Sequence, residues 1–354
     1  MKFQILKMKK INFALLALIA FGLASCHQED PVITEDTTVG KGVFVLNEGT
    51  YTFANSSLTF YNPETDTVTN NLFYRVNGSP IGDVAQSLTL LGDKLFIVVN
   101  NSNYIYKVDA NTMKYEAKVE EFYSPREMCI VAPNKAYVSD LMGTGLWIVN
   151  PQDMSHSGFV ETGKPTESLL QIGSELWTTN WSNYYQPQTT NNTVQVVDIQ
   201  NDVKVSEIEV EREPNSMVVD RDGMVWVLCD NGWEDTTFFL CKINPMLKQV
   251  EKTYTFAGGY PSHLCIDMTG TRLFFIDNNV CSMNINDETS LNTSFIAAEG
   301  RSFYNMAVDP ATGDLYVTDA KDYVQNGLVY RYSSDGVLLK QFSAGICPSA
   351  LVFN

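Results

Sequence analysis

The chain has 354 residues, of which 44% are hydrophobic and 18% charged, and its formal net charge at pH 7 is −17. This length and composition allow a large buried core, which excludes a disordered or low-complexity protein. The strong negative charge repels nucleic acid and anionic lipid surfaces, so we expect no nucleic-acid partner.

The first 25 residues have the pattern of a secretory signal peptide. Four lysines among the first ten residues precede an apolar run at residues 11–23, which is too short to span a membrane. The run ends at Leu23-Ala24-Ser25-Cys26, which resembles the lipobox of bacterial lipoproteins, where cleavage leaves a cysteine that carries the lipid. We therefore predict a lipoprotein signal peptide at residues 1–25 and lipidation of Cys26.

Residues 26–41 have the composition of a solvated tether. They begin with the acidic stretch His27-Gln28-Glu29-Asp30, similar to the export signal of surface-exposed lipoproteins in gut anaerobes of the Bacteroides type, and continue with Pro31 and several Thr and Asp. We expect the protein on the outer surface of the outer membrane, held there through its N-terminal lipid only.

A unit of roughly 40 to 49 residues recurs over residues 42–354. Each unit consists of short β-branched and aromatic runs separated by Gly, Pro, Asn and Asp turns, and no segment has the helical period, so each unit predicts four antiparallel strands. The second run of the unit occurs seven times, for example at residues 95–100, 136–140 and 315–319. A unit this thin cannot bury both of its faces alone, so the units must pack around an axis. The sequence predicts an all-β, seven-bladed β-propeller.

The ends of this region predict how the ring closes. It opens with a second run at residues 43–47 that has no first run before it, and it ends on an unpaired first run at residues 346–354. We expect this C-terminal strand to join the N-terminal blade, because that pairing removes the open edge of the ring.

The cysteines other than Cys26 have no Cys-x-x-Cys spacing, and each lies in or beside an apolar run. We interpret them as small core residues, with one disulfide between Cys229 and Cys241 as the alternative. We expect neither a metal site nor a cofactor of the protein's own.

The repeat also resembles a known family. Units that read Pro-Ser/Asn-x-apolar, then Leu-aromatic-Val-x-Asn/Asp, then Val-Asp resemble the YncE-type propellers over residues 42–354. Within that group, residues 44–49, 56–65 and 82–87 are similar to the BtuG surface lipoproteins, which capture cobalamin for an outer-membrane TonB-dependent transporter. The resemblance implies a protein that binds a corrinoid (vitamin B12) and passes it to such a transporter. The alternatives are capture of another, siderophore-like ligand, or a cell-surface propeller that binds proteins without a small ligand.

We expect the ligand on the face formed by the loops that follow the second runs. Each second run ends in Asn or Asp, which either shapes the turn alone or shapes it and also contacts the ligand. Several of these loops are long and aromatic, which indicates recognition, unless the rings fold back to cover the blade edges. The candidate ligand-binding residues are Asn47, Tyr51, Phe53, Asn100, Arg126, Asp140, Asn180, Trp181, Tyr184, Tyr185, Asp230, Trp233, His263, Asp277, Asp319 and Tyr323.

A corrinoid suits such a face because it is a large disc with an apolar macrocycle and a rim of amide groups. Arg126 and Lys321 are the cations expected on the face, which favours a neutral ligand over an anionic siderophore. We expect no enzyme, since the sequence has no nucleophile, zinc or phosphate-loop motif; a calcium-dependent propeller hydrolase of the lactonase type is the enzymatic alternative. His263 either lines the channel, or acts as a base or as an axial ligand to a bound cobalt.

Overall fold

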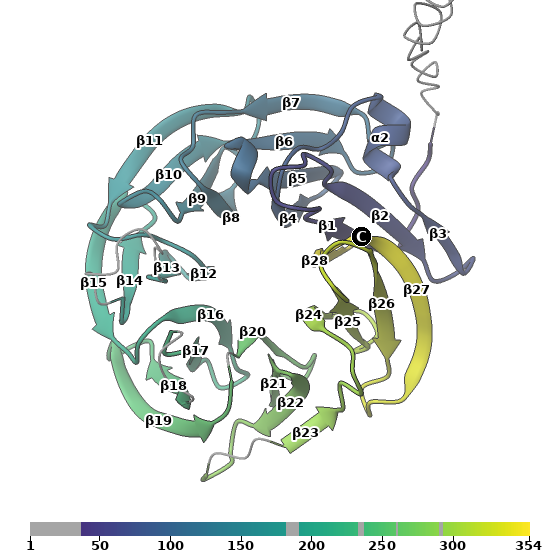
Figure 1. Cartoon of the computed structure of the whole chain (residues 1–354). Helices are drawn as coiled ribbons and strands as arrows, with labels where there is room; N and C mark the ends of the chain where they lie inside the picture. The colour runs from purple at the N-terminus through teal and green to yellow at the C-terminus, as the bar shows by residue number, and fades with distance from the viewer. Residues whose placement is uncertain (1–36, 182–190, 233–236, 260, 290–292) are drawn as a thin grey trace, which may run out of the picture. The chain divides into compact units, whose positions relative to one another are not determined.

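The structure, a computed structural model, describes residues 37–181, 191–232, 237–259, 261–289 and 293–354. Its strands form seven four-stranded antiparallel sheets arranged around a common axis (Figure 1). The described part of the chain is therefore a seven-bladed β-propeller, which confirms the fold class predicted from the repeat.

Each blade contributes its first strand to the centre of the ring and its fourth strand to the outside (Figure 1). From the centre outwards, the strands of the first four blades are β28 (Pro348–Phe353), β1 (Val43–Asn47), β2 (Ser57–Asn62) and β3 (Thr67–Thr69) in blade 1; β4 (Ala85–Leu91), β5 (Lys94–Val99), β6 (Tyr104–Asp109) and β7 (Tyr115–Val119) in blade 2; β8 (Pro125–Ala132), β9 (Lys135–Asp140), β10 (Gly145–Asn150) and β11 (Ser155–Glu161) in blade 3; and β12 (Leu169–Ile172), β13 (Glu175–Thr179), β14 (Thr193–Asp198) and β15 (Val203–Glu209) in blade 4.

The remaining three blades follow in chain order. Their strands are β16 (Pro214–Val219), β17 (Val225–Cys229), β18 (Thr237–Asn244) and β19 (Gln249–Ala257) in blade 5; β20 (Ser262–Ile266), β21 (Arg272–Asp277), β22 (Asn279–Asn284) and β23 (Thr293–Ile296) in blade 6; and β24 (Phe303–Val308), β25 (Leu315–Asp319), β26 (Asn326–Tyr332) and β27 (Leu338–Ile346) in blade 7.

Blade 1 is closed by the C-terminal strand, as the ends of the repeat predicted. β28 pairs antiparallel with β1, so that Phe353 lies opposite Val43 and Ala350 opposite Leu46. The main-chain N–H of Asn354 donates to the carbonyl oxygen of Gly42 (2.9 Å). The pairing joins the two ends of the domain in one sheet.

The second strand of each blade is buried on both faces. Every residue of β1, β17 and β25 is buried, because a neighbouring blade packs on each side. This packing accounts for the uninterrupted apolar and aromatic sequence of these strands.

Apolar cores between the blades hold the ring rigid. One core joins Phe44 and Leu46 of blade 1 to Ile97 of blade 2, and another joins Trp226 of blade 5 to Phe275 of blade 6. Full burial of such a side chain contributes roughly 2 to 3 kcal/mol. The loops at the ends of the strands therefore sit on a stiff scaffold.

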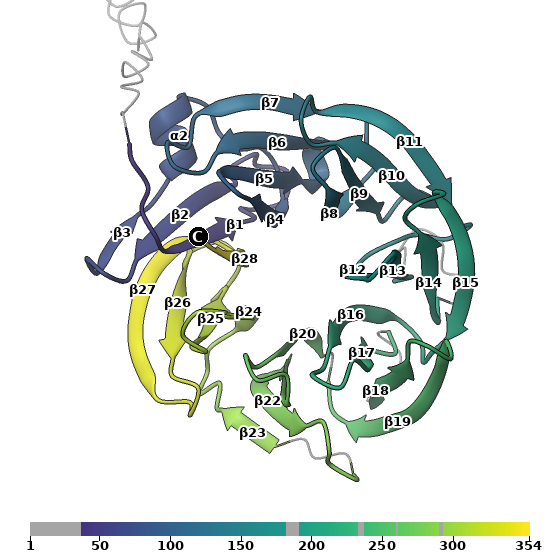
Figure 2. The same ribbon diagram turned by 180° about the vertical axis from the view of Figure 1, so that it is seen from behind.

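The first strand of each blade lies nearest the axis (Figure 2). It is nevertheless less buried than the second strand. Most residues of β4, β8 and β20 are only half-buried. Since these residues lie at the centre of the ring and not at its outer edge, solvent reaches them along the axis. The propeller thus has a central channel lined by its first strands.

A short helix corrects the expectation that the domain has no helical segment. Helix α2 (Leu72–Asn77) lies in the connection between blades 1 and 2 and buries Leu72, Phe73 and Val76. With six residues it is too short to produce a visible 3.6-residue repeat of apolar positions. A single-turn 3-10 helix (Asn100–Ser102) follows β5.

The cysteines after Cys26 are free thiols. Cys229 and Cys241 both lie in the core between blades 4 and 5, and burial raises the pKa of the Cys229 thiol. They are small core residues, as predicted, and the alternative disulfide between them is not formed in this structure.

Candidate functional site

The loops that follow the second strands and those that precede the first strands meet on one side of the ring, which we call the loop face. In blade 3, Asp140 at the end of β9 accepts hydrogen bonds from the main-chain N–H groups of Tyr123 and Ser124, just before β8 (2.9 Å each). In blade 7, Asp319 at the end of β25 accepts from the N–H of Ser302, just before β24 (3.0 Å). In each of these two blades, the Asp side chain thus joins the loop after the second strand to the loop before the first strand.

The Asn and Asp side chains that end the second strands are tied into these loops. Asn47 is fully buried; its Nδ2 donates to Thr59 Oγ1 (3.1 Å) and its Oδ1 accepts from the N–H of Gly345 (2.9 Å). Asn180 is also fully buried and donates to the carbonyl oxygen of Pro165 (2.7 Å). These bonds agree with the turn interpretation, whereas ligand contact by these residues stays a prediction.

The other members of the set make similar contacts. Asn100 donates from Nδ2 to Ser124 Oγ (2.9 Å), and Asp277 accepts from the N–H of Gly259 (3.0 Å). Asp230 accepts from the N–H of Gly232 (2.9 Å), and burial raises the pKa of its carboxyl. The loop face is thus shaped by side chains of the strand ends.

Aromatic side chains, four of them exposed and one half-buried, lie on the loop face. Tyr51 and Phe53, in the loop after β1, are 65% and 70% exposed, and Tyr323, after β25, is also exposed. Trp181, after β13, is half-buried and donates from Nε1 to Asp230 Oδ2 (3.0 Å). Tyr123 was missed in the sequence, although it directly precedes the Ser-Pro that starts β8; it is 63% exposed. We call these five residues the rim.

Three predicted aromatic residues, Tyr184, Tyr185 and Trp233, lie outside the described residues. The remaining predicted residues, Arg126 and His263, lie on the first strands and so line the channel.

Below the rim, polar side chains gather at the end of the channel that opens on the loop face. Each of them lies at or just before the beginning of a first strand, except one, which directly follows the end of a second strand. We call them the floor cluster: Glu48 after β1, Gln86 on β4, Arg126 and Glu127 on β8, Glu167 before β12, His263 on β20 and Tyr304 on β24.

Arg126 is the centre of the floor cluster. Its Nε and Nη2 donate to the carboxylate of Glu167 of the next blade (2.7 and 2.8 Å), and its Nη1 donates to Gln86 Oε1 of the preceding blade (2.7 Å). This two-bonded pairing fixes the planar guanidinium across three blades. The positive charge of Arg126 is therefore balanced by Glu167.

Two further carboxyls of the floor cluster are half-buried and have no basic partner at hydrogen-bond distance among the described residues. Tyr304 Oη donates to Glu48 Oε2 (2.9 Å), and the N–H of Leu169 donates to Glu127 Oε2 (2.8 Å). Burial raises the pKa of Glu48 and of Glu127 to about 7, because it disfavours the charged form. The charge of the floor therefore changes near neutral pH.

The raised pKa of Glu127 predicts a pH-dependent stability. The folded protein holds this proton more tightly than the unfolded chain, whose value is 4.5, so the stabilisation is complete below pH 4.5 and is lost as the pH rises through 7. Wild type should therefore lose free energy of unfolding as the pH rises from 5 to 8, whereas Glu127→Gln should not lose this part. The difference between the two proteins should change in favour of the variant by at most about 3 kcal/mol over this range.

Urea unfolding of both proteins at pH 5, 6.5 and 8 measures this difference. The exposed Glu64 supplies the matched control Glu64→Gln, for which we expect the same pH profile as wild type. A constant difference between Glu127→Gln and wild type across this range would mean that Glu127 is not buried in a charge-disfavouring site.

His263 is the least satisfied member of the floor cluster. Its Nδ1 atom is buried and has no hydrogen-bond partner among the described residues, and its backbone is in the left-handed region (φ 57°). Burial and the nearby charge of Arg126 lower the pKa of the imidazole to about 4, so the ring is neutral at pH 7. Its ring centroid is 6.3 Å from that of Tyr304.

Sequence reasoning missed most of the floor cluster. Glu48, Gln86, Glu127, Glu167 and Tyr304 were not among the predicted site residues. The available signal was their position, since Gln86, Glu127, Glu167 and Tyr304 stand at or just after the start of the repeat's first run, where the residue type varies from unit to unit.

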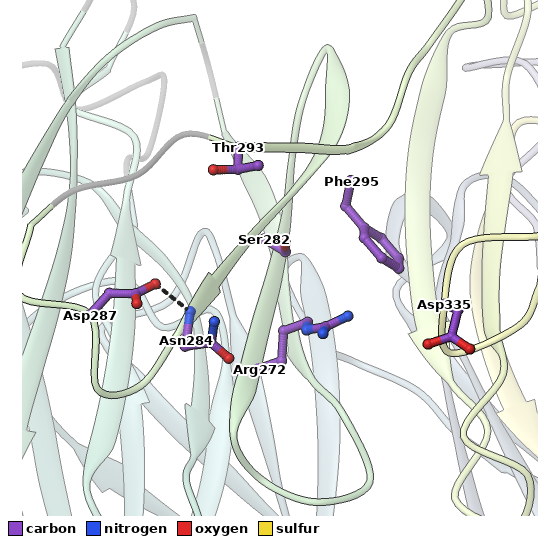
Figure 3. Close-up of a pocket in the computed structure, with 7 residues that line it drawn as sticks. All are labelled: Arg272, Ser282, Asn284, Asp287, Thr293, Phe295 and Asp335. Carbon is purple, nitrogen blue, oxygen red and sulfur yellow. Dashed lines mark hydrogen bonds between the residues drawn. The ribbon is translucent and has the colours of Figure 1, made fainter.

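A separate cavity of about 400 Å³ lies on blade 6, away from the channel (Figure 3). Arg272 and Phe295 point toward the turn that carries Asp335, and the guanidinium carbon lies 5.4 Å from the ring centroid. The other lining residues are Ser282, Asn284, Asp287 and Thr293. None of the predicted site residues lines this cavity.

No group of three or more His, Cys, Asp or Glu side chains in the described parts of the chain is placed to hold a metal ion. The three glutamates of the floor cluster therefore form no such group either.

Comparison with known proteins places the fold in a family. The family described as Domain of unknown function (DUF5074) matches residues 41–354. No curated protein matches the sequence.

Several solved structures share the fold. A quinonprotein alcohol dehydrogenase-like protein from Bacteroides thetaiotaomicron is 18% identical, with a TM-score of 0.68 over 88% of this chain and 78% of that one. A protein from Lactobacillus plantarum is 12% identical, with a TM-score of 0.66 over 89% and 100%. A β-propeller domain from Myceliophteria thermophila is 12% identical, with a TM-score of 0.60 over 81% and 96%. At these identities the likeness concerns the fold alone.

Proposed function

Since the chain belongs to the DUF5074 family, whose description assigns no activity, we propose its function from the site: it is a binding propeller that captures a corrinoid of the vitamin B12 type, and it is not an enzyme. The β-propeller fold and the family agree with a ligand-binding or interaction propeller. The resemblance of residues 44–49 and 82–87 to the BtuG lipoproteins supports the choice of ligand class.

The observation that carries the proposal is a rim of exposed aromatic rings around a polar floor, on one face of a rigid ring. Tyr51, Phe53 and Tyr123 expose most of their surface there. Rigid aromatic side chains offer a large contact area at a small cost in conformational entropy. A corrin ring offers apolar faces for such contacts, and its amide groups can bond to the floor.

Charge favours a neutral ligand over an anionic one. Arg126 is the cation of the floor cluster, and Glu167 already balances it. Glu48 and Glu127 add negative charge as the pH rises through about 7. A catecholate or carboxylate siderophore would be repelled at such a floor, whereas an uncharged rim of amides would not.

The direct test is capture from solution. Purified residues 27–354 incubated with cyanocobalamin and passed through gel filtration should elute as a coloured protein. A colourless protein that instead retains a partner protein would favour the interaction-propeller alternative. Steady oxidation of an alcohol, as the name of one structural neighbour suggests for that neighbour, would contradict the assignment as a binding protein.

We also propose that Cys26 carries the lipid anchor at the cell surface and that a TonB-dependent transporter receives the ligand. Residues 1–36 lie outside the described part of the chain. Within the described residues, no helix has the length and apolar character needed to cross a membrane.

The anchor leads to a separate prediction. Cys26→Ala should move the protein from the membrane fraction to the soluble fraction, because the acyl chains supply the membrane affinity. The cobalamin affinity of the released protein should equal that of the purified domain. Immunoblots of the two fractions measure the shift, and a variant that stays in the membrane fraction would point to another anchor.

A further inference from the structure

We propose that the floor cluster binds a neutral primary amide of the ligand: Glu48 and Glu127 accept its N–H hydrogens, and Arg126 donates to its carbonyl oxygen. The inference rests on the proposed function, because a corrinoid carries such amides on its rim, and it names the part of the site that would recognise them.

The carboxyls of the floor have spare capacity to accept hydrogen bonds. An ionised carboxylate has about four acceptor sites. Among the described residues, Glu48 accepts from the hydroxyl of Tyr304, and Glu127 accepts from the N–H of Leu169. Both side chains are half-buried and keep unused acceptor sites at the channel wall. A ligand group that bonds to these sites must carry N–H or O–H donors.

Arg126 offers spare donors beside these acceptors. A guanidinium has five N–H hydrogens. In the described structure Arg126 uses its Nε hydrogen and one on each terminal nitrogen, for Glu167 and Gln86. The two other hydrogens have no acceptor among the described residues. Donors next to acceptors match a primary amide, which has two N–H hydrogens and one carbonyl oxygen.

His263 supports a ligand at the floor cluster by an independent observation. Its Nδ1 is buried without a partner in the described structure. Buried polar side-chain atoms are paired in most proteins, and an unpaired one calls for a ligand or an ordered water. The left-handed backbone at His263 is a conformation that costs energy for a residue other than glycine, which is often found at binding sites.

A neutral amide matches the floor better than an ammonium group, because an ammonium has donors only and offers no acceptor to the spare hydrogens of Arg126. A carboxylate would face the three glutamates of the floor. Transfer of a neutral amide into this position carries no such electrostatic cost, provided that its hydrogen bonds are made.

The proposal predicts a pH dependence of binding. The titratable groups that face the amide site are Glu48, Glu127, Glu167, Arg126, His263 and Tyr304. In the range from pH 6 to 8, the two carboxyls with a pKa of about 7 change from protonated to ionised, and only the ionised form is a full acceptor. Wild type should bind cyanocobalamin about tenfold more tightly at pH 8 than at pH 6.

The experiment is calorimetric titration of cyanocobalamin into wild type, Glu48→Gln, Glu127→Gln and the surface control Glu64→Gln, at pH 6 and pH 8. The two floor variants should bind about tenfold more weakly than wild type at pH 8 and should show a reduced pH dependence. Glu64→Gln should match wild type at both values. Circular dichroism melting checks that each variant is folded.

A second measurement needs no floor variant. Cobalamin derivatives with a single side-chain amide hydrolysed to a carboxylate are titrated into wild type. One of them should lose at least about tenfold in affinity at pH 8, because its carboxylate would face Glu48 and Glu127, and Glu48→Gln should recover part of that loss.

The outcomes separate the two proposals. If wild type does not bind cyanocobalamin, the proposed function is wrong and this inference goes with it. If wild type binds but the floor variants, the pH and the hydrolysed amides all leave affinity unchanged, the ligand is held elsewhere on the loop face and only the amide site is overturned.

Discussion

Deletion of residues 346–354 is expected to abolish the folded monomer. These residues contain β28, which pairs with β1 along its whole length and closes the ring. Without it, β1 has an open edge, Phe44 and Leu46 lose part of their cover, and blades 7 and 2 lose a neighbour. We expect the free-energy cost of losing a whole strand from the ring to exceed a typical net stability of about 5 to 15 kcal/mol. Gel filtration and thermal unfolding should show aggregates and no cooperative transition.

A circular permutant supplies the matched control for this deletion. The end of β28 lies beside the start of β1, since Asn354 bonds to Gly42. Residues 346–354 placed before residue 42 through a short Gly-rich turn should therefore restore a hairpin and a folded monomer. If the simple deletion stays monomeric with an unchanged melting temperature, closure by β28 does not stabilise the ring.

Substitution of the rim aromatics is expected to cost the most affinity for a corrinoid. Phe53→Ala or Tyr51→Ala should each weaken binding by about 2 kcal/mol, roughly thirtyfold, if the ring is buried against the macrocycle. Both side chains are mostly exposed in the free protein, so its melting temperature should change little. Trp181→Ala should lower both the affinity for the corrinoid and the melting temperature, because Trp181 also donates to Asp230, whose carboxyl is buried.

Met246→Ala is a matched control for the rim. Met246 is 89% exposed, in the turn between the third and fourth strands of blade 5, at the opposite end of the strands from the loop face. We expect unchanged cobalamin affinity, measured by calorimetry. Equal affinity of all rim variants and the control would place the ligand elsewhere, and a lower melting temperature of free Phe53→Ala would mean that this ring covers the blade edge.

The blade number, the strand order and the closure could be predicted from the sequence, because each depends on a local pattern that the chain repeats. Runs such as Val43–Asn47 and Leu315–Asp319 have the alternation and turn residues of a strand by themselves. Each end of the domain has one strand run without a partner, so the two runs could be assigned to the same blade. Helix α2 could not be predicted in this way, because six residues of a connection are too few to show a 3.6-residue repeat of apolar positions.

Rim residues could be predicted only in part, for a similar reason. A long aromatic loop such as that around Tyr51 and Phe53 is visible as a departure from the short turns that a hairpin needs. Tyr123 lies in a short connection, and its place on the loop face follows from the hydrogen bond between its N–H and Asp140, which only the folded blade forms.

The floor cluster was decided by the tertiary structure. Its members come from blades 1, 2, 3, 4, 6 and 7, and Tyr304 and Glu48 are 256 residues apart in the chain, yet their oxygens lie 2.9 Å apart once the ring has closed. The raised pKa of Glu48 likewise depends on burial at the axis, which no neighbour in sequence supplies. Repetition along the chain determines the blades, whereas the chemistry at the centre depends on which differing residues the closed ring brings face to face.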